Sequence, residues 1–299
     1  MGKKFSGVSQ TMSRFRGWIQ AGATLLTNLH LPNFFKGGLY QGTGKTVCVP
    51  GLNCYSCPAA SGACPIGAFQ AVVGSSKFSF SYYITGFLIL LGVLLGRFIC
   101  GFLCPFGWFQ ELLHKIPSPK LSTKRLKPLR YVKYAVLLIM VVLLPVLVTN
   151  ELGMGDPFFC KYLCPQGVLE GALPLAAVNS GIRAALGALF TWKAAVLLTV
   201  IVCSVLFYRP FCKWLCPLGA FYALLNRVSL FRMQVDTHKC VSCGACAKAC
   251  KMDVDITKNP NHAECIRCGM CIKACPTDAI CYRYGLGDKT QTTDKGETI

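Results

Sequence analysis

Residues 240–276 read CVSCGACAKACKMDVDITKNPNHAECIRCGMCIKACP and place eight cysteines in two matched runs. Each run has the spacing C-x2-C-x2-C-x3-C, and a proline follows the second run. This spacing is typical of a pair of 4Fe-4S clusters, in which the fourth cysteine of each run binds the cluster of the other run. We therefore predict a first cluster on Cys240, Cys243, Cys246 and Cys275, and a second on Cys265, Cys268, Cys271 and Cys250.

Zinc is the alternative occupant, because zinc knuckles also use paired C-x2-C units. Eight cysteines in duplicated spacing argue against it. Lys251 stands where the second run has Pro276, a departure that affects local geometry and not ligation. Residues 233–284 are predicted to form a small α+β two-cluster ferredoxin domain, and the polar residues 285–299 a disordered tail.

A Cys-Pro-x-Gly sequence, here called a Cys-Pro unit, occurs four times upstream of these runs, and in three of the four another cysteine stands four residues earlier. A C-x3-C-P unit places two thiols on neighbouring helical turns, and the proline then ends the helical pairing so that the chain can wrap a cluster. Each unit would supply half of the ligands of a cubane. The units are Cys64-Pro, Cys100-x3-Cys104-Pro, Cys160-x3-Cys164-Pro and Cys212-x3-Cys216-Pro.

Each unit follows an apolar stretch, and the composition, 53% hydrophobic and 14% charged, is too apolar for an ordinary soluble protein. A membrane-spanning helix needs about 20 apolar residues. We expect residues 1–232 to form a mostly α domain, a bundle of four transmembrane helices with repeated Cys-Pro turns. Lys193 interrupts the last span and is expected to snorkel or to face the protein. The expected spans are about 15–32, 78–99, 131–149 and 184–207.

Basic residues orient these spans, because Lys and Arg near span ends stay in the cytoplasm. Residues 115–133 carry seven basic residues and follow the second span, so this loop is expected inside. The loop from Asp156 to Glu170 is then expected outside. Both termini would lie in the cytoplasm of a multi-pass protein of the cell membrane.

This topology pairs the Cys-Pro units by membrane side. The second and fourth units would hold a third cluster on the cytoplasmic side, and the first and third a fourth cluster on the outer side. A disulfide or a redox-active pair at Cys54 and Cys57 is the alternative for the outer thiols. The third cluster is predicted on Cys100, Cys104, Cys212 and Cys216, and the fourth on Cys57, Cys64, Cys160 and Cys164, with Cys54 or Cys48 as alternates.

The chain has 31 Lys and Arg against 12 Asp and Glu, a net charge of +19. Anionic clusters balance part of this charge, so nucleic acid is not expected as a partner. His30 and His114 lie at opposite ends of the membrane part and are candidate quinone ligands. Flavin is not expected in this chain, because Ala21 stands where a covalent-flavin threonine motif has an acidic residue or serine.

The spans, the C-x3-C-P units and the two-cluster runs together resemble the NapH-type membrane quinol dehydrogenase family and the membrane part of NosR-like proteins, over about residues 78–282. The resemblance implies a membrane electron-transfer subunit with a cytoplasmic ferredoxin domain. Such a subunit works with other redox subunits and exchanges electrons with quinone or an external redox partner. The unit at Cys160 and the segment 48–64 are additions to the simplest pattern of the family. The resemblance therefore does not identify the redox partner or the direction of electron flow.

Two other functions remain to be weighed. One is a membrane-anchored iron-sulfur sensor or assembly protein that relays no electrons; it would need an output domain, and none is evident. The other is a thiol-disulfide carrier that uses the outer cysteines. The sequence shows no Walker loop and no GxGxxG after a strand, so any catalysis would be redox chemistry performed by cofactors.

Overall fold

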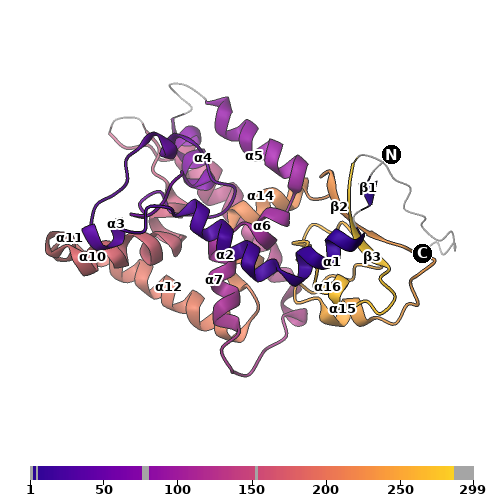
Figure 1. Ribbon diagram of the computed structural model, residues 1–299. Coiled ribbons are helices and arrows are strands. Elements are labelled where there is room, and N and C mark those ends of the chain that lie inside the picture. Colours follow the sequence, from indigo (N-terminus) through magenta and orange to yellow (C-terminus); the bar gives the residue numbers. More distant parts are fainter. Residues whose placement is uncertain (1–2, 5, 76–80, 152–153, 286–299) are drawn as a thin grey trace.

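The computed structural model describes residues 3–4, 6–75, 81–151 and 154–285. It is mostly helical, with a small antiparallel sheet at one end (Figure 1). This confirms a mostly α protein with a ferredoxin-type domain at the C-terminal end. Nearly all of the predicted tail, and residues 78–80 of the second expected span, lie outside the described residues.

The helical part contains two helical stretches that are long and apolar enough to cross a membrane, among the residues described. One runs from Lys124 to Leu147 and the other is α12 (Ala188–Leu206). The first is built from η2 (Lys124–Tyr131), α8 (Val132–Val136), η3 (Leu137–Leu143) and α9 (Leu144–Leu147). Shorter helices complete this part: α3 (Asn33–Lys36), η1 (Thr43–Thr46), α4 (Pro65–Gly74), η4 (Phe159–Leu163), η5 (Gly167–Ala172), α10 (Leu173–Val178) and α11 (Ser180–Ala184).

Four full-length spans were expected, and two of them are shorter in the structure. The first, expected at about 15–32, contains α2 (Arg16–Thr27), which has only 12 residues and is preceded by α1 (Ser6–Arg14). The second, α5 (Tyr82–Leu95), has 14 residues and ends at Gly96, where φ is +55°. A Cβ at Gly96 would lie 2.6 Å from the Arg267 side chain, so the approach of the ferredoxin domain requires glycine there.

The Cys-Pro turns share one local structure. Cys64, Cys104 and Cys216 have extended backbone and cap the helices α4, α7 (Pro105–His114) and α14 (Pro217–Leu225). Proline occupies the first helical position in each, where its missing N–H leaves no bond unmade. Cys164 is extended in the same way at the end of η4. The preceding cysteines lie in the short helices α6 (Phe98–Phe102), η4 and α13 (Pro210–Trp214).

The ferredoxin domain contains a segment that the sequence analysis assigned to the membrane part. Its sheet has the order β1-β3-β2, from β1 (Lys3–Lys4), β2 (Phe231–Val235) and β3 (Ile280–Tyr284). Helix α1 packs on β3 and on α16 (Met270–Lys273), and the Tyr282 N–H donates to Ser9 Oγ at 2.9 Å. The N-terminal residues therefore complete a domain whose core lies at the other end of the chain.

Buried ion pairs join the ferredoxin domain to the helical part. Glu264 accepts from Arg97 at 2.8 Å and from Lys133 at 2.5 Å, and both cations are fully buried. Lys213, 1% exposed, contacts Asp253 at 3.0 Å. Because an unpaired buried charge is costly, these pairs hold the two parts in one arrangement.

Candidate iron-sulfur sites

The first cysteine set lines a small cavity in the ferredoxin domain. Its walls are formed by the three leading cysteines of the first run and the last cysteine of the second run, beside α15 (Ala245–Ala249). The Ala279 N–H donates to Cys275 Sγ at 3.3 Å, as expected for a thiolate. The structure thus brings together the residues that the crossed ferredoxin spacing predicts: Cys240, Cys243, Cys246 and Cys275.

The second set lies on the side of the ferredoxin domain that contacts the helical part. Cys271 is within electrostatic range of Cys265, Cys268 and Cys250, which is the last cysteine of the first run. The Ile266 carbonyl beside this set lies against Gly101, where a Cβ would overlap it. Glycine at position 101 therefore lets the second set pack directly against α6, which carries Cys100.

The third set is fully enclosed where α6, α7, α13 and α14 meet. Cys216 is within electrostatic range of Cys100, Cys104 and Cys212, and all four are less than 9% exposed. Two donors are aimed at sulfur in this set. Gln110 Nε2 lies 3.1 Å from Cys212 Sγ, and the Gly219 N–H donates to Cys216 Sγ at 3.3 Å. The pairing of the second and fourth units predicted from topology agrees with this geometry.

The fourth set differs from the favoured prediction at one position. Cys160 and Cys164 are each within electrostatic range of Cys64 and Cys54. Lys193, in the middle of an apolar helix, faces this set and donates to the Cys160 carbonyl at 3.1 Å. The structure therefore groups Cys54, Cys64, Cys160 and Cys164, and we refer to these four as the fourth set.

Cys57, which the sequence analysis favoured over Cys54, points elsewhere. Its Sγ lies 3.6 Å from Asn28 Oδ1, and its side chain packs with Ala59 and Ala60. The Cys57 N–H bonds to the Cys54 carbonyl in a tight turn, while the Cys54 N–H is held by Glu170 at 3.0 Å. Cys54 and Cys57 stay within electrostatic range of each other, and of the two it is Cys54 that also lies in range of Cys160 and Cys164. The Cys-Pro pattern does not contain this difference.

The donor chemistry of these sets fits 4Fe-4S clusters better than single ions. Each set offers four thiols, and three of the four have N–H groups aimed at sulfur or a cation beside the set. Among the described residues, no three His, Cys, Asp or Glu side chains converge closely enough to hold one metal ion. A cubane binds its thiolates at separate corners, whereas a zinc ion requires them to converge.

The two candidate quinone ligands lie apart from each other and from the cysteine sets. The His30 ring stacks on Tyr40 with 3.6 Å between ring centroids. The His114 ring packs edge-on against Tyr208 at 5.5 Å. Both histidines thus have ordinary aromatic neighbours, and nothing in these contacts supports a bound quinone.

Family models place the chain among known proteins. Two models, both described as 4Fe-4S binding domain, match it. The chain belongs to the 4Fe-4S binding domain family. The first model matches four times in the helical part, and each match includes one Cys-Pro unit; the second matches twice, once for each ferredoxin run. The matched residues are 62–83, 79–124, 133–173 and 189–235 for the first model, and 233–254 and 259–281 for the second.

Several curated proteins are similar over part of this 4Fe-4S chain. An uncharacterized protein of Methanocaldococcus jannaschii is 28% identical, over 67% of this chain and 77% of its own length. The putative electron transport protein YccM of Escherichia coli is 26% identical, over 57% of this chain and 45% of its own. The regulatory protein NosR of Stutzerimonas stutzeri is 27% identical, over 54% of this chain and 21% of its own.

These likenesses confirm the expected NapH/NosR-like family of iron-sulfur electron transport proteins. The chain spans less than half of YccM and NosR, so what those whole proteins do is not carried over. No solved structure matches this chain.

Tyr222 is fully buried near both the third and the fourth sets and was not predicted. It lies within electrostatic range of Cys100 and Cys104 of the third set and of Cys64 of the fourth. Its hydroxyl donates to the Pro50 carbonyl at 3.0 Å. No spacing in the sequence marks Tyr222, because its role depends on which segments pack around α14.

Proposed function

We propose that this chain is a membrane-bound electron-transfer protein that holds four 4Fe-4S clusters in a continuous series. The observation that carries the proposal is the adjacency of the four cysteine sets. The second set lies against the third at Gly101, and Tyr222 is within electrostatic range of cysteines of both the third and the fourth. When bound, a 4Fe-4S cluster supplies one-electron transfer.

The position of Tyr222 is relevant to the distance over which electrons would have to cross the membrane. A bilayer core is about 30 Å thick, too long for a single electron-transfer step between clusters at its two faces. Buried aromatic side chains instead lie beside cysteines of both the third and the fourth sets. Besides Tyr222, Phe159 and Phe211 contact each other at 6.5 Å between ring centroids, and each precedes a cysteine of one set. The two membrane sets are thus close neighbours inside the helical part.

The side chains around the third and fourth sets exclude water and supply positive charge. Phe106, Phe159, Phe211 and Tyr222 are each at most 1% exposed. Fully buried Arg209 donates to the Cys100 carbonyl, and Lys193 donates to the Cys160 carbonyl. A cation held in such surroundings offsets the negative charge of thiolate ligands, which favours metal binding.

The orientation of the protein in the membrane is inferred from the basic loop at residues 115–133. Residues 115–133 lie on the same side as the ferredoxin domain, since Arg130 and Lys133 contact Asp253 and Glu264. We infer that this side is cytoplasmic and that the fourth set faces another redox component outside. Reporter fusions after Lys120 and Ser180 should show internal and external activity respectively. Internal activity at both positions would contradict the orientation.

Metal content tests the proposal most directly. The purified chain should hold about 16 iron atoms with equal acid-labile sulfide, because four cubanes of four irons each are proposed. Colorimetric iron and sulfide analysis with quantified EPR spectra measures this. About eight irons per chain would leave only the ferredoxin clusters, and the absence of iron would favour a thiol-disulfide carrier.

The turn that contains Cys54 and Cys57 allows a matched comparison of two cysteine variants. Cys54→Ser should lower the iron content by about four atoms per chain, whereas Cys57→Ser should leave it unchanged, because only Cys54 lies with Cys64, Cys160 and Cys164. The two variants remove the same group three residues apart, so each is the control for the other. The opposite pattern of iron loss would restore Cys57 as the ligand.

A further inference from the structure

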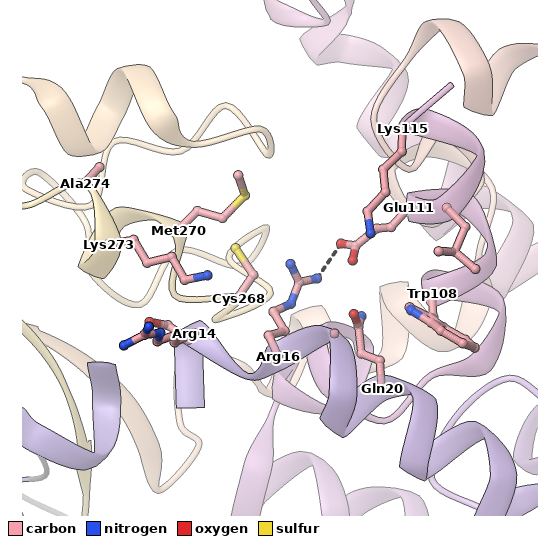
Figure 2. A pocket seen from close by; sticks show the side chains of 13 residues that line it. Arg14, Arg16, Gln20, Trp108, Glu111, Lys115, Cys268, Met270, Lys273 and Ala274 are labelled. Carbon is pink, nitrogen blue, oxygen red and sulfur yellow. Dashed lines mark hydrogen bonds and ion pairs between the residues drawn. The ribbon is translucent and has the colours of Figure 1, made fainter. Parts of the chain in front are cut away.

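A cavity of about 390 Å³ opens at the seam between the ferredoxin domain and the helical part. Figure 2 shows its lining, which comes from the junction of α1 and α2, from α7, and from α16 with the preceding Cys268. The cavity has the size of a small-molecule site. It touches the second cysteine set only at Cys268, and no part of the proposed function uses it.

The lining is strongly basic. Arg14, Lys115 and Lys273 are exposed, and none of them forms an ion pair with a described residue. Glu111 is the carboxylate in the cavity, and it already forms an ion pair with Arg16. It forms a second ion pair with Arg209, which does not line the cavity; the Arg209 Nε lies 2.9 Å from Glu111 Oε1. Burial acts to raise the pKa of Glu111, but Arg209 and Arg16 lower it to about 2. Glu111 is thus neutralised locally, and three positive charges face the cavity without an acidic partner among the described residues.

The position of α12 shows at which depth of the proposed membrane the cavity lies. Tyr208, two residues beyond its end, donates to Glu111 and contacts the His114 ring. The Leu121 N–H bonds to the carbonyl of Leu206, the last residue of α12. The cavity therefore lies where a membrane-spanning helix would leave the bilayer on the cytoplasmic side, which is the depth of lipid headgroups.

Apolar side chains stand next to the basic lining along the chain. Trp18 is 79% exposed and follows Gly17, and Ile116 is 47% exposed and follows Lys115. Aromatic and aliphatic groups beside basic ones are typical of segments at a membrane interface. A free nucleotide or inorganic phosphate would need the cations but not these exposed apolar groups.

We propose that this cavity binds the phosphate of an anionic phospholipid headgroup, with Arg14, Lys115 and Lys273 as its ligands. The proposal rests on the membrane location in the proposed function. Lys115 belongs to the helical part and Lys273 to the ferredoxin domain, so a bound headgroup would contact both parts beside Cys268. Basic pockets on the cytoplasmic side of membrane proteins recognise such headgroups.

The test compares lipid binding in two charge-matched triple variants of the full chain. The pocket variant is Arg14→Gln, Lys115→Gln, Lys273→Gln; the control, Lys124→Gln, Arg125→Gln, Lys127→Gln, removes three exposed charges outside the cavity. Native mass spectrometry should detect one phosphatidylglycerol per wild-type or control chain. The pocket variant should bind it about 100-fold more weakly, which corresponds to about 1 kcal/mol per cation.

Three outcomes would overturn the proposal. One is equal retention of phosphatidylglycerol and phosphatidylcholine by the wild type; another is equal binding of glycerol 3-phosphate, which would make the ligand a soluble anion. The third is a loss of iron from the pocket variant with unchanged lipid binding, because the cations would then serve the cluster at Cys268. Iron content measured on the same samples separates failure of this inference from failure of the proposed function.

A second measurement, fluorescence quenching by brominated lipid, tests the same site without the triple variant. Trp108 lines the cavity, so brominated phosphatidylglycerol in nanodiscs should quench tryptophan fluorescence more than brominated phosphatidylcholine does. Because Trp18 also stands beside the cavity, the comparison uses the double variant Trp18→Phe, Trp108→Phe, in which this excess quenching should disappear although Trp192 and Trp214 remain. Excess quenching that persists in the double variant would place the lipid elsewhere and overturn the proposal.

Discussion

Glu264→Gln is expected to destabilise the fold by about 3–5 kcal/mol, because it removes one partner from a buried ionic network. Glu264 is 5% exposed and accepts from Arg97 and Lys133, whose side chains are fully buried. Burial acts to raise the pKa of Glu264, but Arg97 and Lys133 lower it to about 2. The carboxylate is therefore ionised in the folded chain, and an amide would leave two buried cations without a counter-charge.

Chemical unfolding in detergent, followed by circular dichroism and by release of iron, measures this effect. The matched control is Asp156→Asn, which breaks an exposed ion pair with Lys161 and should leave the unfolding midpoint unchanged. Because Glu264 joins the ferredoxin domain to the helical part, its variant should also become more sensitive to protease between the two. An unfolding midpoint equal to that of the control would show that the network contributes little.

Cys100→Ser and Cys216→Ser are each expected to remove the same cluster, although the two residues are 116 positions apart in sequence. Both belong to the third set, so either change should cost about four irons per chain. Because this set lies between the second and the fourth, either change should also abolish electron transfer between the ferredoxin domain and the outer side. The three thiols left in each variant would be buried without metal, which destabilises the local packing.

EPR spectra of the two variants provide the comparison. The same signal should be missing from both, and the double variant should lose no more iron than either single one. Cys203→Ser, which changes a thiol in α12 outside the four sets, is the control and should retain all the iron. Two different missing signals would show that the pairing of the second and fourth units is wrong.

Much of the candidate site was predictable because cluster ligation by short runs is a local property. The spacing of Cys240 to Cys275 contains the crossed pairing, and the structure places Cys275 in the cavity of the first run. The repeated Cys-Pro turns were equally readable, since a proline after cysteine fixes where the next helix begins. The grouping of Cys100, Cys104, Cys212 and Cys216 needed only one further step, the alternation of membrane sides.

Other features of the fold and of the candidate site depend on contacts between segments that are far apart in the sequence. The spacing of cysteines and apolar residues does not encode such contacts. The proposal of Cys54 in place of Cys57 depends on the contacts of that turn with Glu170 and Asn28, which are more than 20 residues from it. Hydropathy gave four spans, but α5 ends early because Arg267 of the ferredoxin domain occupies the space beside Gly96.

The sequence by itself determined that the chain has 4Fe-4S binding domains, and it predicted four cysteine sets, because thiol spacing and proline act over a few residues. Only the tertiary structure decided how the proposed sets are arranged. It placed Tyr222 near cysteines of both membrane sets, the second set against Gly101, and the N-terminal strand in the ferredoxin sheet. The physical reason is that packing and buried ion pairing act between surfaces, and those surfaces exist only once the chain has folded.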